Sequence, residues 1–504
     1  MNTAKGSAGS HVSFYNALII AFACFGSITY GYCSSIIGTT LGQPSFTTYF
    51  GLATSSNAHG LEGAMNGLFQ AGGLFGTLSF GYVADKFGRR TALFTSSVIC
   101  VIGGALQAGS VDIAMFIVAR FITGFGVGGN VFLVPLWQSE IAPPHARGLL
   151  VGLHGIFILV GYNIATWLGV GFFYVNAGGA QWRPPLAIQC LPPLILALGV
   201  PFIPESPRWL IDHQKEERAR LILTKLHESK RTEQQESFAD QEFYQIKTQL
   251  EYERTQDSSC KAIFTTDHYR KRAIIGFYLL FAGQLTGTTV INNYGPTLYA
   301  SLGYGAADQL ILSGGWLVLG LVANVANAIL LDRVGRRWLM VSGMIGCLIS
   351  LIGEIIMLAL FQCSDNKSGK IAGVFFLYLH LAFYGTCIDG STYVYGSEIW
   401  PTHLRGKGFS LSVAGLFVGS TTLLTAAPTA FARIGWKFYL VMTVCTVIST
   451  IFICFWPETK GLPLEEIAAK FGEKVTVQLN DSADAASVSI ADVSAPVKKA
   501  ENEK

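Results

Sequence analysis

Charged side chains are scarce in this chain. Only 13% of its 504 residues are Asp, Glu, Lys or Arg, whereas 51% are hydrophobic. A soluble domain typically contains about 25% charged residues, so most of this chain is expected to lie in lipid. The formal net charge is only +3. So small a charge gives no electrostatic reason to expect a nucleic-acid partner.

Residue sets that carry enzyme chemistry are also missing. The ten cysteines are scattered, mostly within apolar segments, without a CxxC pair, and no metal-binding cluster is visible. The Gly-rich run at 124–129 follows no predicted strand and lies in an apolar segment, so it is not a nucleotide-binding loop. No nucleophile–base set is present. We therefore predict a protein that is not an enzyme and that binds no metal and no cofactor.

Long apolar runs take the place of charge. A helix that spans a bilayer needs about 20 apolar residues. Twelve such segments occur near 14–38, 61–83, 92–109, 113–136, 149–171, 184–203, 272–294, 309–331, 338–361, 371–396, 406–430 and 434–456. The predicted fold class is an all-α membrane protein with two six-helix bundles.

The predicted segments divide the chain into five parts. These are a cytoplasmic N-terminus (1–13), an N-terminal bundle (14–203), a cytoplasmic helical linker domain (204–271), a C-terminal bundle (272–456) and a cytoplasmic tail (457–504). The linker domain is rich in charge and has apolar residues at helical spacing, which predicts short amphipathic helices. The tail is polar and rich in Ala and Ser, and it is expected to be disordered from about residue 474.

Three short motifs occur twice, in the same order in each half. DKFGRR at 85–90 returns as DRVGRR at 332–337, SEI at 139–141 returns at 397–399, and PES at 204–206 returns as PET at 457–459. The intervals are similar, at 247 positions for Asp85 and Asp332, 258 for Glu140 and Glu398, and 253 for Glu205 and Glu458. This indicates an internal duplication of about 250 residues. A duplicated membrane protein with the same basic loop in both halves is most simply a secondary transporter.

Charge placement predicts the topology. The repeated motifs lie in short basic loops, whereas the loop from Thr39 to Gly60 has no Lys or Arg. Because short basic loops stay in the cytoplasm, we expect both termini, the central loop and all repeated motifs on that side. Asn366 begins a glycosylation sequence in an expected outside loop. We expect a monomer in the lipid bilayer of the plasma membrane, with the vacuolar membrane as the alternative.

The repeated motifs bring basic and acidic residues together at helix ends. Arginines there can bridge to Glu140 and Glu398 on neighbouring helices. Because both signs of charge recur in each half, we predict a lock that closes in one conformation and opens in the other; the alternative is that the basic residues only fix topology. The candidate residues for gating or coupling are Asp85, Arg89, Arg90, Arg120, Glu140, Arg147, Glu205, Asp332, Arg336, Arg337, Glu398 and Arg405.

Arg120 begins a Gly-rich apolar segment. A buried arginine in a spanning helix is costly unless it is paired or hydrated. Gly124 and Gly128 have the spacing of a small-residue face, which predicts close packing against another helix.

Together these motifs resemble the sugar porter family of the major facilitator superfamily, in a style closest to its fungal members. The resemblance runs from about Phe14 to Phe471 and includes Gly31-Tyr32, Arg120 with its glycines, and Gln284-Leu285-Thr286-Gly287. It implies the major facilitator fold, rocker-type alternating access and a small-molecule sugar or polyol as the partner. It also implies a path lined by helices 1, 4, 7 and 10, with contributions from helices 5, 8 and 11.

The chain departs from the family pattern where substrate and protons are handled. Cys33 replaces the acid of the family's helix-1 Gly-Tyr-Asp, and a thiol, which titrates near ~8.5, is no proton carrier at neutral pH. Taken alone, this favours facilitated diffusion. The family's amide positions in helices 5 and 7 are Gly155, Gly283 and Thr289, and Tyr393 replaces the helix-10 tryptophan. Fewer amides and more space suggest a ligand bulkier than a free hexose, or a differently oriented one.

Polar residues that remain near these positions are the candidate substrate ligands. They can ring a polyhydroxylated ligand, and the alternative is that the Asn and Thr residues only hold helices together. The candidates are His154, Gln284, Thr289, Asn292, Asn293, Asp389 and Tyr393.

Helix 10 carries an acid that is new to the pattern. Asp389 and Tyr393 are four residues apart, so they share a helix face. Three uses stay open: a proton site with protons as the coupling ion, an acceptor for sugar hydroxyls, or a structural pair with a cation such as Arg120. Glu354 in helix 9 is another intramembrane acid, for which we expect a structural role.

The leading prediction is a secondary transporter that moves a sugar or sugar-like polyol by alternating access. Transport is either facilitated or coupled to protons through Asp389. The alternative is an exporter of a polyhydroxylated or glycosylated metabolite, suggested by the missing hexose ligands. A non-transporting sugar sensor fits less well, because sensors of this family have longer signalling tails.

Overall fold

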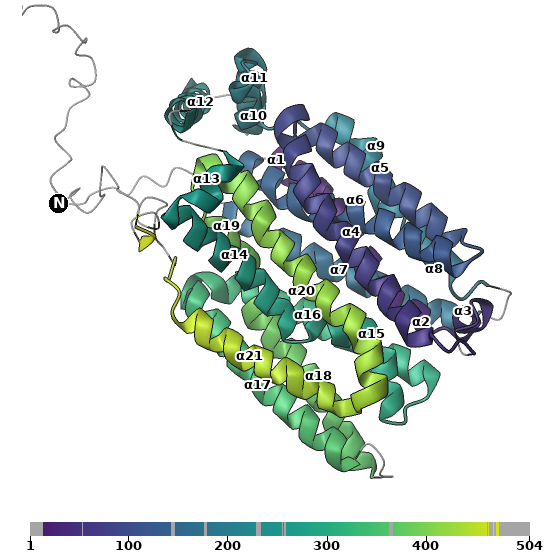
Figure 1. Ribbon diagram of the computed structural model, residues 1–504. Coiled ribbons are helices and arrows are strands. Elements are labelled where there is room, and N and C mark those ends of the chain that lie inside the picture. Colours follow the sequence, from purple (N-terminus) through teal and green to yellow (C-terminus); the bar gives the residue numbers. More distant parts are fainter. Residues whose placement is uncertain are drawn as a thin grey trace, which may run out of the picture.

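The computed structural model describes residues 14–52, 54–142, 147–175, 179–227, 233–254, 256, 259–361, 366–460, 462, 467 and 470–472. Within these ranges the chain is helical and contains no strand. In Figure 1 the first half (purple to blue) and the second half (teal to yellow) lie side by side. The short helices α10 (Pro207–Asp212), α11 (Glu216–His227) and α12 (Glu233–Arg254) lie beyond one end of the long helices.

The halves differ in how many helical pieces they contain. The first half comprises α1 (Phe14–Ala23), α2 (Phe25–Leu41), α3 (Pro44–Tyr49), α4 (Ala58–Phe87), α5 (Arg89–Ala108), α6 (Ile113–Ile141), α7 (Arg147–Phe173), α8 (Arg183–Ile188), α9 (Leu191–Gly199) and η1 (Val200–Phe202). The second comprises α13 (Cys260–Thr265), α14 (Asp267–Leu285), α15 (Thr288–Ser301), α16 (Ala306–Val334), α17 (Arg336–Phe361), α18 (Lys367–Tyr384), η2 (Gly385–Asp389), α19 (Gly390–Glu398), η3 (Thr402–Leu404), α20 (Arg405–Ile434), η4 (Gly435–Lys437) and α21 (Phe438–Cys454).

The predicted membrane segments coincide with these helices. Ten stretches of the described residues are long and apolar enough to cross a membrane. One of them, Arg405–Cys454, contains both α20 and α21, and the 30-residue helix α4 coincides with the predicted segment at 61–83. Each of the twelve predicted segments is therefore one helix or a run of consecutive helical pieces. The all-α, multi-pass fold class is confirmed.

Glycines let α4 and α6 approach closely. A Cβ on Gly124 would meet the backbone of Phe69, and a Cβ on Gly128 would meet the backbone of Gly73. The predicted small-residue packing face is therefore confirmed. Because the two backbones are so close, α6 presents Arg120 directly to α4 and to the neighbouring helix α2.

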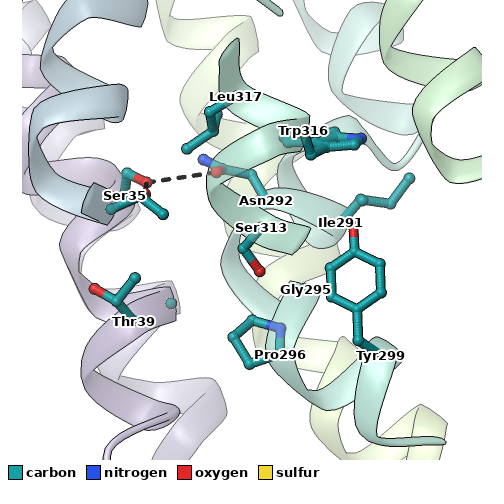
Figure 2. Close-up of a pocket in the computed structure, with 12 residues that line it drawn as sticks. Ser35, Thr39, Ile291, Asn292, Gly295, Pro296, Tyr299, Ser313, Trp316 and Leu317 are labelled. Carbon is teal, nitrogen blue, oxygen red and sulfur yellow. Dashed lines mark hydrogen bonds between the residues drawn. The ribbon is translucent and has the colours of Figure 1, made fainter. Parts of the chain in front are cut away.

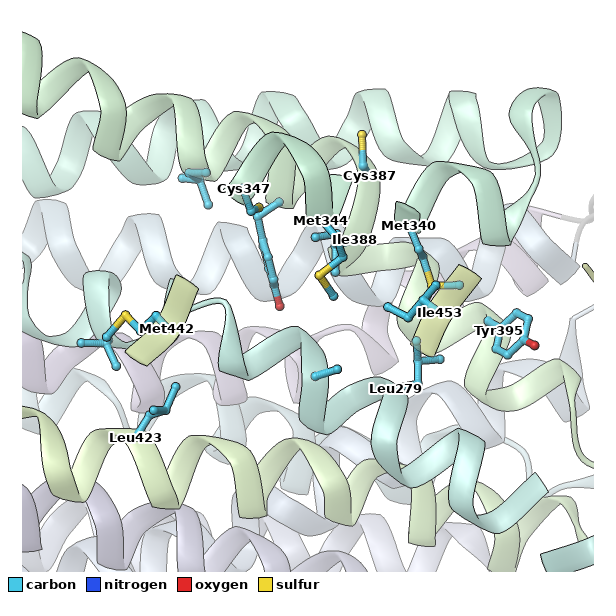
Figure 3. Packing of buried hydrophobic residues seen from close by; sticks show 14 of the residues in the cluster. Leu279, Met340, Met344, Cys347, Cys387, Ile388, Tyr395, Leu423, Met442 and Ile453 are labelled. Carbon is cyan, nitrogen blue, oxygen red and sulfur yellow. The ribbon is translucent and has the colours of Figure 1, made fainter. Parts of the chain in front are cut away.

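The second half is held together by an apolar core. Figure 3 shows Met340 and Met344 of α17 beside Ile388 of η2 and Ile453 of α21, with Leu279 of α14 close by. All five side chains are buried. This packing fixes η2, and with it the start of α19, against the rest of the bundle.

The predicted segment at 272–294 is not one straight helix. Gly287 has φ = +88°, a backbone conformation that residues with a Cβ rarely adopt, so α14 and α15 are separated there. α15 then bends at Tyr294, and Pro296 has no N–H to donate to the carbonyl of Asn292. Segment 371–396 is also irregular, because η2 is a π-helical turn. Both irregular stretches lie next to the cavity described below.

Helices α10 to α12 occupy the stretch between the halves. Trp209, Leu210, Phe243 and Leu250 form a small apolar core of their own. The indole N–H of Trp209 donates to the carbonyl of Asp85 at 2.9 Å, which attaches these helices to the end of α4. The predicted disorder from about residue 474 lies outside the described residues.

Candidate functional site

A cavity lies between the two halves. Its walls come from α2 and α7 of the first half and from α14, α15, α16, α18, η2, α19 and α20 of the second. The empty space, including its opening, is ≈ 630 Å³. We refer to it as the central cavity.

Most of the predicted substrate ligands line the central cavity. Gln284, Thr289, Asn292, Asp389 and Tyr393 do so. These residues come from the ends of the broken helix pair α14–α15 and from the π-helical turn with the helix after it. Their roles as ligands stay predictions.

The other two predicted ligands lie behind the wall. His154 Nδ1 is 2.8 Å from the hydroxyl of Ser27, and its ring meets Tyr393 edge-on at a centroid distance of 5.9 Å. Asn293 donates its side-chain N–H to the carbonyl of Thr289 at 2.9 Å. Neither lines the central cavity, and their roles as ligands also stay predictions.

Gln284 is held in place by three neighbours. Its side-chain N–H donates to the hydroxyl of Tyr384 at 3.4 Å, and its carbonyl oxygen accepts from Ser420 at 3.2 Å. The carbonyl oxygen also accepts from Thr289 across the break at Gly287. Because a side-chain amide offers two donors and two acceptor sites, capacity is left for a ligand hydroxyl.

Asp389 is the last residue of η2. Asn324 of α16 donates its side-chain N–H to Oδ2 of Asp389 at 2.5 Å. No ion pair joins Asp389 to a cation in the described part of the chain. The structural pairing with Arg120 that the sequence left open is therefore wrong.

Arg120 has other partners. Its Nη1 donates to the carbonyl of Cys33 at 2.8 Å and its Nε to the carbonyl of Met65 at 3.2 Å. The guanidinium also lies 4.1 Å from the ring centroid of Phe69. Backbone carbonyls and an aromatic face thus take the place of the missing helix-1 carboxylate.

A smaller cavity adjoins the central one on the side away from the repeated motifs. Figure 2 shows Ser35 and Thr39 of α2 facing Asn292, Ser313 and Tyr299 of the second half. The hydroxyl of Ser35 donates to the side-chain oxygen of Asn292 at 3.5 Å. The space is ≈ 280 Å³, and Asn292, Trp316 and Leu317 line both cavities. Both cavities therefore lie beside α15.

The repeated motif of the first half is a compact ion-pair cluster. Arg89 of α5 makes two hydrogen bonds with Glu140 of α6, at 3.0 and 2.9 Å, and lies 3.5 Å from Asp85. Glu205 accepts the backbone N–H groups of Arg89 and Arg90 at 2.9 and 3.2 Å. The carboxylate thereby stabilises the positive end of α5. Burial raises the pKa of Glu205, although these amide hydrogen bonds lower it.

The second half repeats this cluster. Arg336 of α17 pairs with Glu398 at 2.9 Å. Glu458 accepts the backbone N–H groups of Arg336 and Arg337, both at 3.0 Å, as Glu205 does in the first half. Arg337 also donates to the carbonyl of Cys454. The expected glutamate partners are thus in contact with their arginines, whereas a gating role stays a prediction.

Four predicted residues remain: Arg147, Asp332, Arg405 and Asn366. The side chains of Arg147 and Asp332 lie outside the described residues, and Arg405 begins α20. Asn366 caps α18, where its Oδ1 accepts the backbone N–H of Ser368 at 3.0 Å. Glycosylation at Asn366 stays a prediction.

Aromatic residues of the central cavity were missed. Tyr30, Tyr162, Trp316 and Tyr384 line it, and the sequence analysis names none of them as a candidate. Asn324, which orients Asp389, was missed too. An available signal was the polar pair Asn324 and Asn327 at positions i and i+3 of one apolar segment, which indicates a single polar helix face.

A family model described as "Sugar (and other) transporter" matches residues 19–471. The chain belongs to the sugar porter family of the major facilitator superfamily. The resemblance drawn from the motifs is therefore confirmed, and this sugar porter is a transporter rather than an enzyme.

Known relatives of this sugar porter carry several names. The MFS-type transporter criB of Aspergillus cristatus is 34% identical, with 89% of this chain and 91% of that protein covered. A quinate permease of Neurospora terricola is 33% identical (90% and 88% covered), and a high-affinity glucose transporter of Kluyveromyces lactis is 31% identical (90% and 84%).

A solved structure confirms the fold of this sugar porter. The proton:xylose symporter XylE of E. coli, bound to 6-bromo-6-deoxy-D-glucose, matches with a TM-score of 0.78. It is 25% identical, with 92% of this chain and 100% of that chain covered.

Proposed function

We propose that this protein carries a sugar or sugar-like polyol through the central cavity by alternating access. The observation that supports it most is the position of Gln284, Thr289 and Asn292, which line a cavity whose walls come from both halves. Amide and hydroxyl side chains suit a polyhydroxylated ligand because they donate and accept hydrogen bonds. The bundles predicted at 14–203 and 272–456 are the parts that would rock against each other.

Coupling to protons through Asp389 is the second part of the proposal. Asp389 lines the central cavity, and Cys33 does not supply the carboxyl group that the family pattern has in helix 1. A relative in fold, XylE, is named as a proton symporter. A carboxyl group that alternates between proton-bound and free forms at the substrate site can link the two fluxes.

The test is uptake of labelled glucose and xylose into proteoliposomes, with and without an inward proton gradient. If the gradient drives accumulation in the wild type while Asp389→Asn only equilibrates the sugar, coupling through Asp389 holds. Wild-type uptake that ignores the gradient would make the protein a facilitator. If neither sugar nor a panel of polyols moves, sugar transport is the wrong function.

Export of a bulkier metabolite is the alternative function. Gly155 faces the central cavity, and a Cβ added at Gly283 would still have no atom within 3.4 Å, its nearest neighbour being Tyr384 Oη at 3.7 Å. Efflux from preloaded vesicles tests it against the uptake proposal.

We further propose a plasma-membrane location with both termini in the cytoplasm. The test is the accessibility of terminal epitopes in intact and in permeabilised cells.

A further inference from the structure

Among the described residues, the lining of the central cavity carries negative charge only. Asp389 is the only charged residue among the described residues that line it, and Lys, Arg and His are absent from that lining. Asn324 occupies Oδ2 at 2.5 Å, while Oδ1 accepts a hydrogen bond from no described residue. An isolated carboxylate is expensive in such surroundings, and a neutral hydrogen-bond donor offsets only part of that cost. The cavity therefore leaves an anionic position for a ligand to balance.

The lining of the central cavity also contains several aromatic rings. Tyr30, Tyr162, Tyr384, Tyr393 and Trp316 all line the same cavity as Asp389. Tyr30 and Tyr162 lie 6.3 Å apart between ring centroids, at a tilt of 46°. Cations are attracted to the faces of aromatic rings within about 6 Å, and aromatic cages that contain a carboxylate are suited to ammonium groups.

Uncharged polar groups occupy one side of the cavity, among apolar residues such as Ile158 and Leu416. Gln284, Thr289 and Asn292 contribute amide and hydroxyl groups on the α14–α15 side. These groups suit ligand hydroxyls, so the cavity combines a site for positive charge with a site for a polyol. A purely apolar cation would leave the remaining hydrogen-bonding capacity of these amides unused.

We propose that the substrates of this protein include a positively charged, hydroxyl-bearing amine whose ammonium group binds at Asp389 among the tyrosines. This inference rests on the proposed function, transport through the central cavity, and narrows its substrate class. An anion such as quinate brings a like charge against Asp389 and is disfavoured. A carboxylate binds either a proton or an ammonium group, so the two compete for the same side chain.

Three probes of similar size test this proposal: glucose, which is neutral; glucosamine, whose amine carries a proton at mildly acidic pH; and quinate, which is an anion. Purified full-length protein is reconstituted, and initial uptake of each labelled probe is measured with the membrane potential clamped at zero and no proton gradient. A charge-assisted hydrogen bond favours glucosamine over glucose by about 10-fold or more in kcat/KM. Quinate is expected to be the poorest of the three.

Two variants assign the preference to a residue. Asp389→Asn keeps the size and one acceptor oxygen, so the glucosamine-to-glucose ratio should fall to near one. Glu354→Gln is the matched control, because Glu354 is buried in α17 but does not line the central cavity, and it should keep the wild-type ratio. The wild-type ratios decide the proposal even if Asp389→Asn does not fold.

The outcomes separate this inference from the proposed function. Glucose uptake that equals or exceeds glucosamine uptake overturns the inference but leaves sugar transport intact. A ratio that survives in Asp389→Asn overturns the assignment to Asp389. Failure of all three probes to move overturns both the proposed function and the inference that rests on it.

Discussion

Arg120 shows how a single residue can keep its position after its usual partner is lost. The guanidinium is 1% exposed, and it binds the backbone carbonyls of Cys33 and Met65 and the ring of Phe69. Because a buried charge is tolerated only when it is hydrogen-bonded, these contacts explain why the arginine persists beside a cysteine. Arg120 also supplies a positive charge that could pair with a carboxylate at position 33.

We predict that Cys33→Asp is tolerated. The new carboxylate would lie next to Arg120, so its burial is compensated, and the thermal midpoint should stay within a few degrees of the wild type. Cys347→Asp is the control, because Cys347 is also fully buried but its thiol contacts the backbone carbonyl of His380, at 3.7 Å, rather than a cation. An unpaired buried charge costs about 3–5 kcal/mol. Thermal unfolding in detergent measures both.

Substitution of Arg120 provides a second test of the same prediction. Cys33→Asp combined with Arg120→Leu should be far less stable than Cys33→Asp alone, because the carboxylate then lacks its cation. Additive effects of the two changes would show that residue 33 and Arg120 do not interact.

Side-chain contacts were predictable at the motifs, whereas in the central cavity most of the polar lining was predictable and the aromatic lining was not. Arg89 with Glu140 could be found because charged residues are conspicuous in an apolar chain and both belong to a repeated motif. Tyr30 and Tyr162 could not, because an aromatic residue in a spanning helix faces lipid, core or cavity with the same local pattern. Only the three-dimensional arrangement of helices decides which of these surfaces a tyrosine lines.

At the scale of the helix, α5 and α17 begin in the same way. Each follows a glycine with positive φ, +93° at Gly88 and +103° at Gly335, and each has a glutamate bound to its first backbone N–H groups. The glutamates, Glu205 and Glu458, come from the segments that follow the sixth and twelfth predicted spans. In each half, a glutamate from the end of that half therefore caps the first turn of an earlier helix, α5 or α17.

Removing such a cap should destabilise the protein measurably. Glu458→Ala leaves the first two backbone N–H groups of α17, and those of Thr459 and Lys460, without their carboxylate. It is expected to cost about 1–2 kcal/mol, whereas Glu458→Gln keeps an oxygen acceptor and should cost less. Glu216→Ala, which breaks the exposed pair with Lys247 at 3.0 Å, is the control and should cost about 0–1 kcal/mol. Equal thermal midpoints for Glu458→Ala and Glu216→Ala would contradict this assignment.

The break between α14 and α15 depends on Gly287. With φ = +88° and Met442 against the position of a Cβ, Gly287→Ala combines backbone strain of about 1–2 kcal/mol with a packing clash. Gly51→Ala is the matched control, because φ is +63° but the nearest atom to a Cβ is 3.9 Å away. We expect Gly287→Ala to reduce both stability and transport, since Gln284 and Thr289 flank the break. Loss of stability alone would show that the break does not position the ligands.

The two halves touch on both sides of the central cavity. On the side away from the motifs, a Cβ on Gly38 of α2 would lie 3.0 Å from the carbonyl oxygen of Asn292 of α15. On the motif side, a Cβ on Gly81 of α4 would lie 3.7 Å from the Cβ of Ser410 of α20. The cavity is thus enclosed between two contacts. Alternating access requires that each contact opens while the other is closed.

A disulfide across the motif-side contact should stop transport. A separation of 3.7 Å between Cβ positions suits a disulfide, so Gly81→Cys with Ser410→Cys should cross-link on oxidation. Because the bond joins α4 to α20, the motif side can no longer open, and uptake should be lost and then restored by a reductant. Gly396→Cys with Ser412→Cys, 3.8 Å apart but both in the second half, is the control and should leave uptake intact. Both pairs are made with Cys260→Ser, since Cys260 is exposed. Full uptake by the cross-linked Gly81–Ser410 pair would mean that the halves do not separate there.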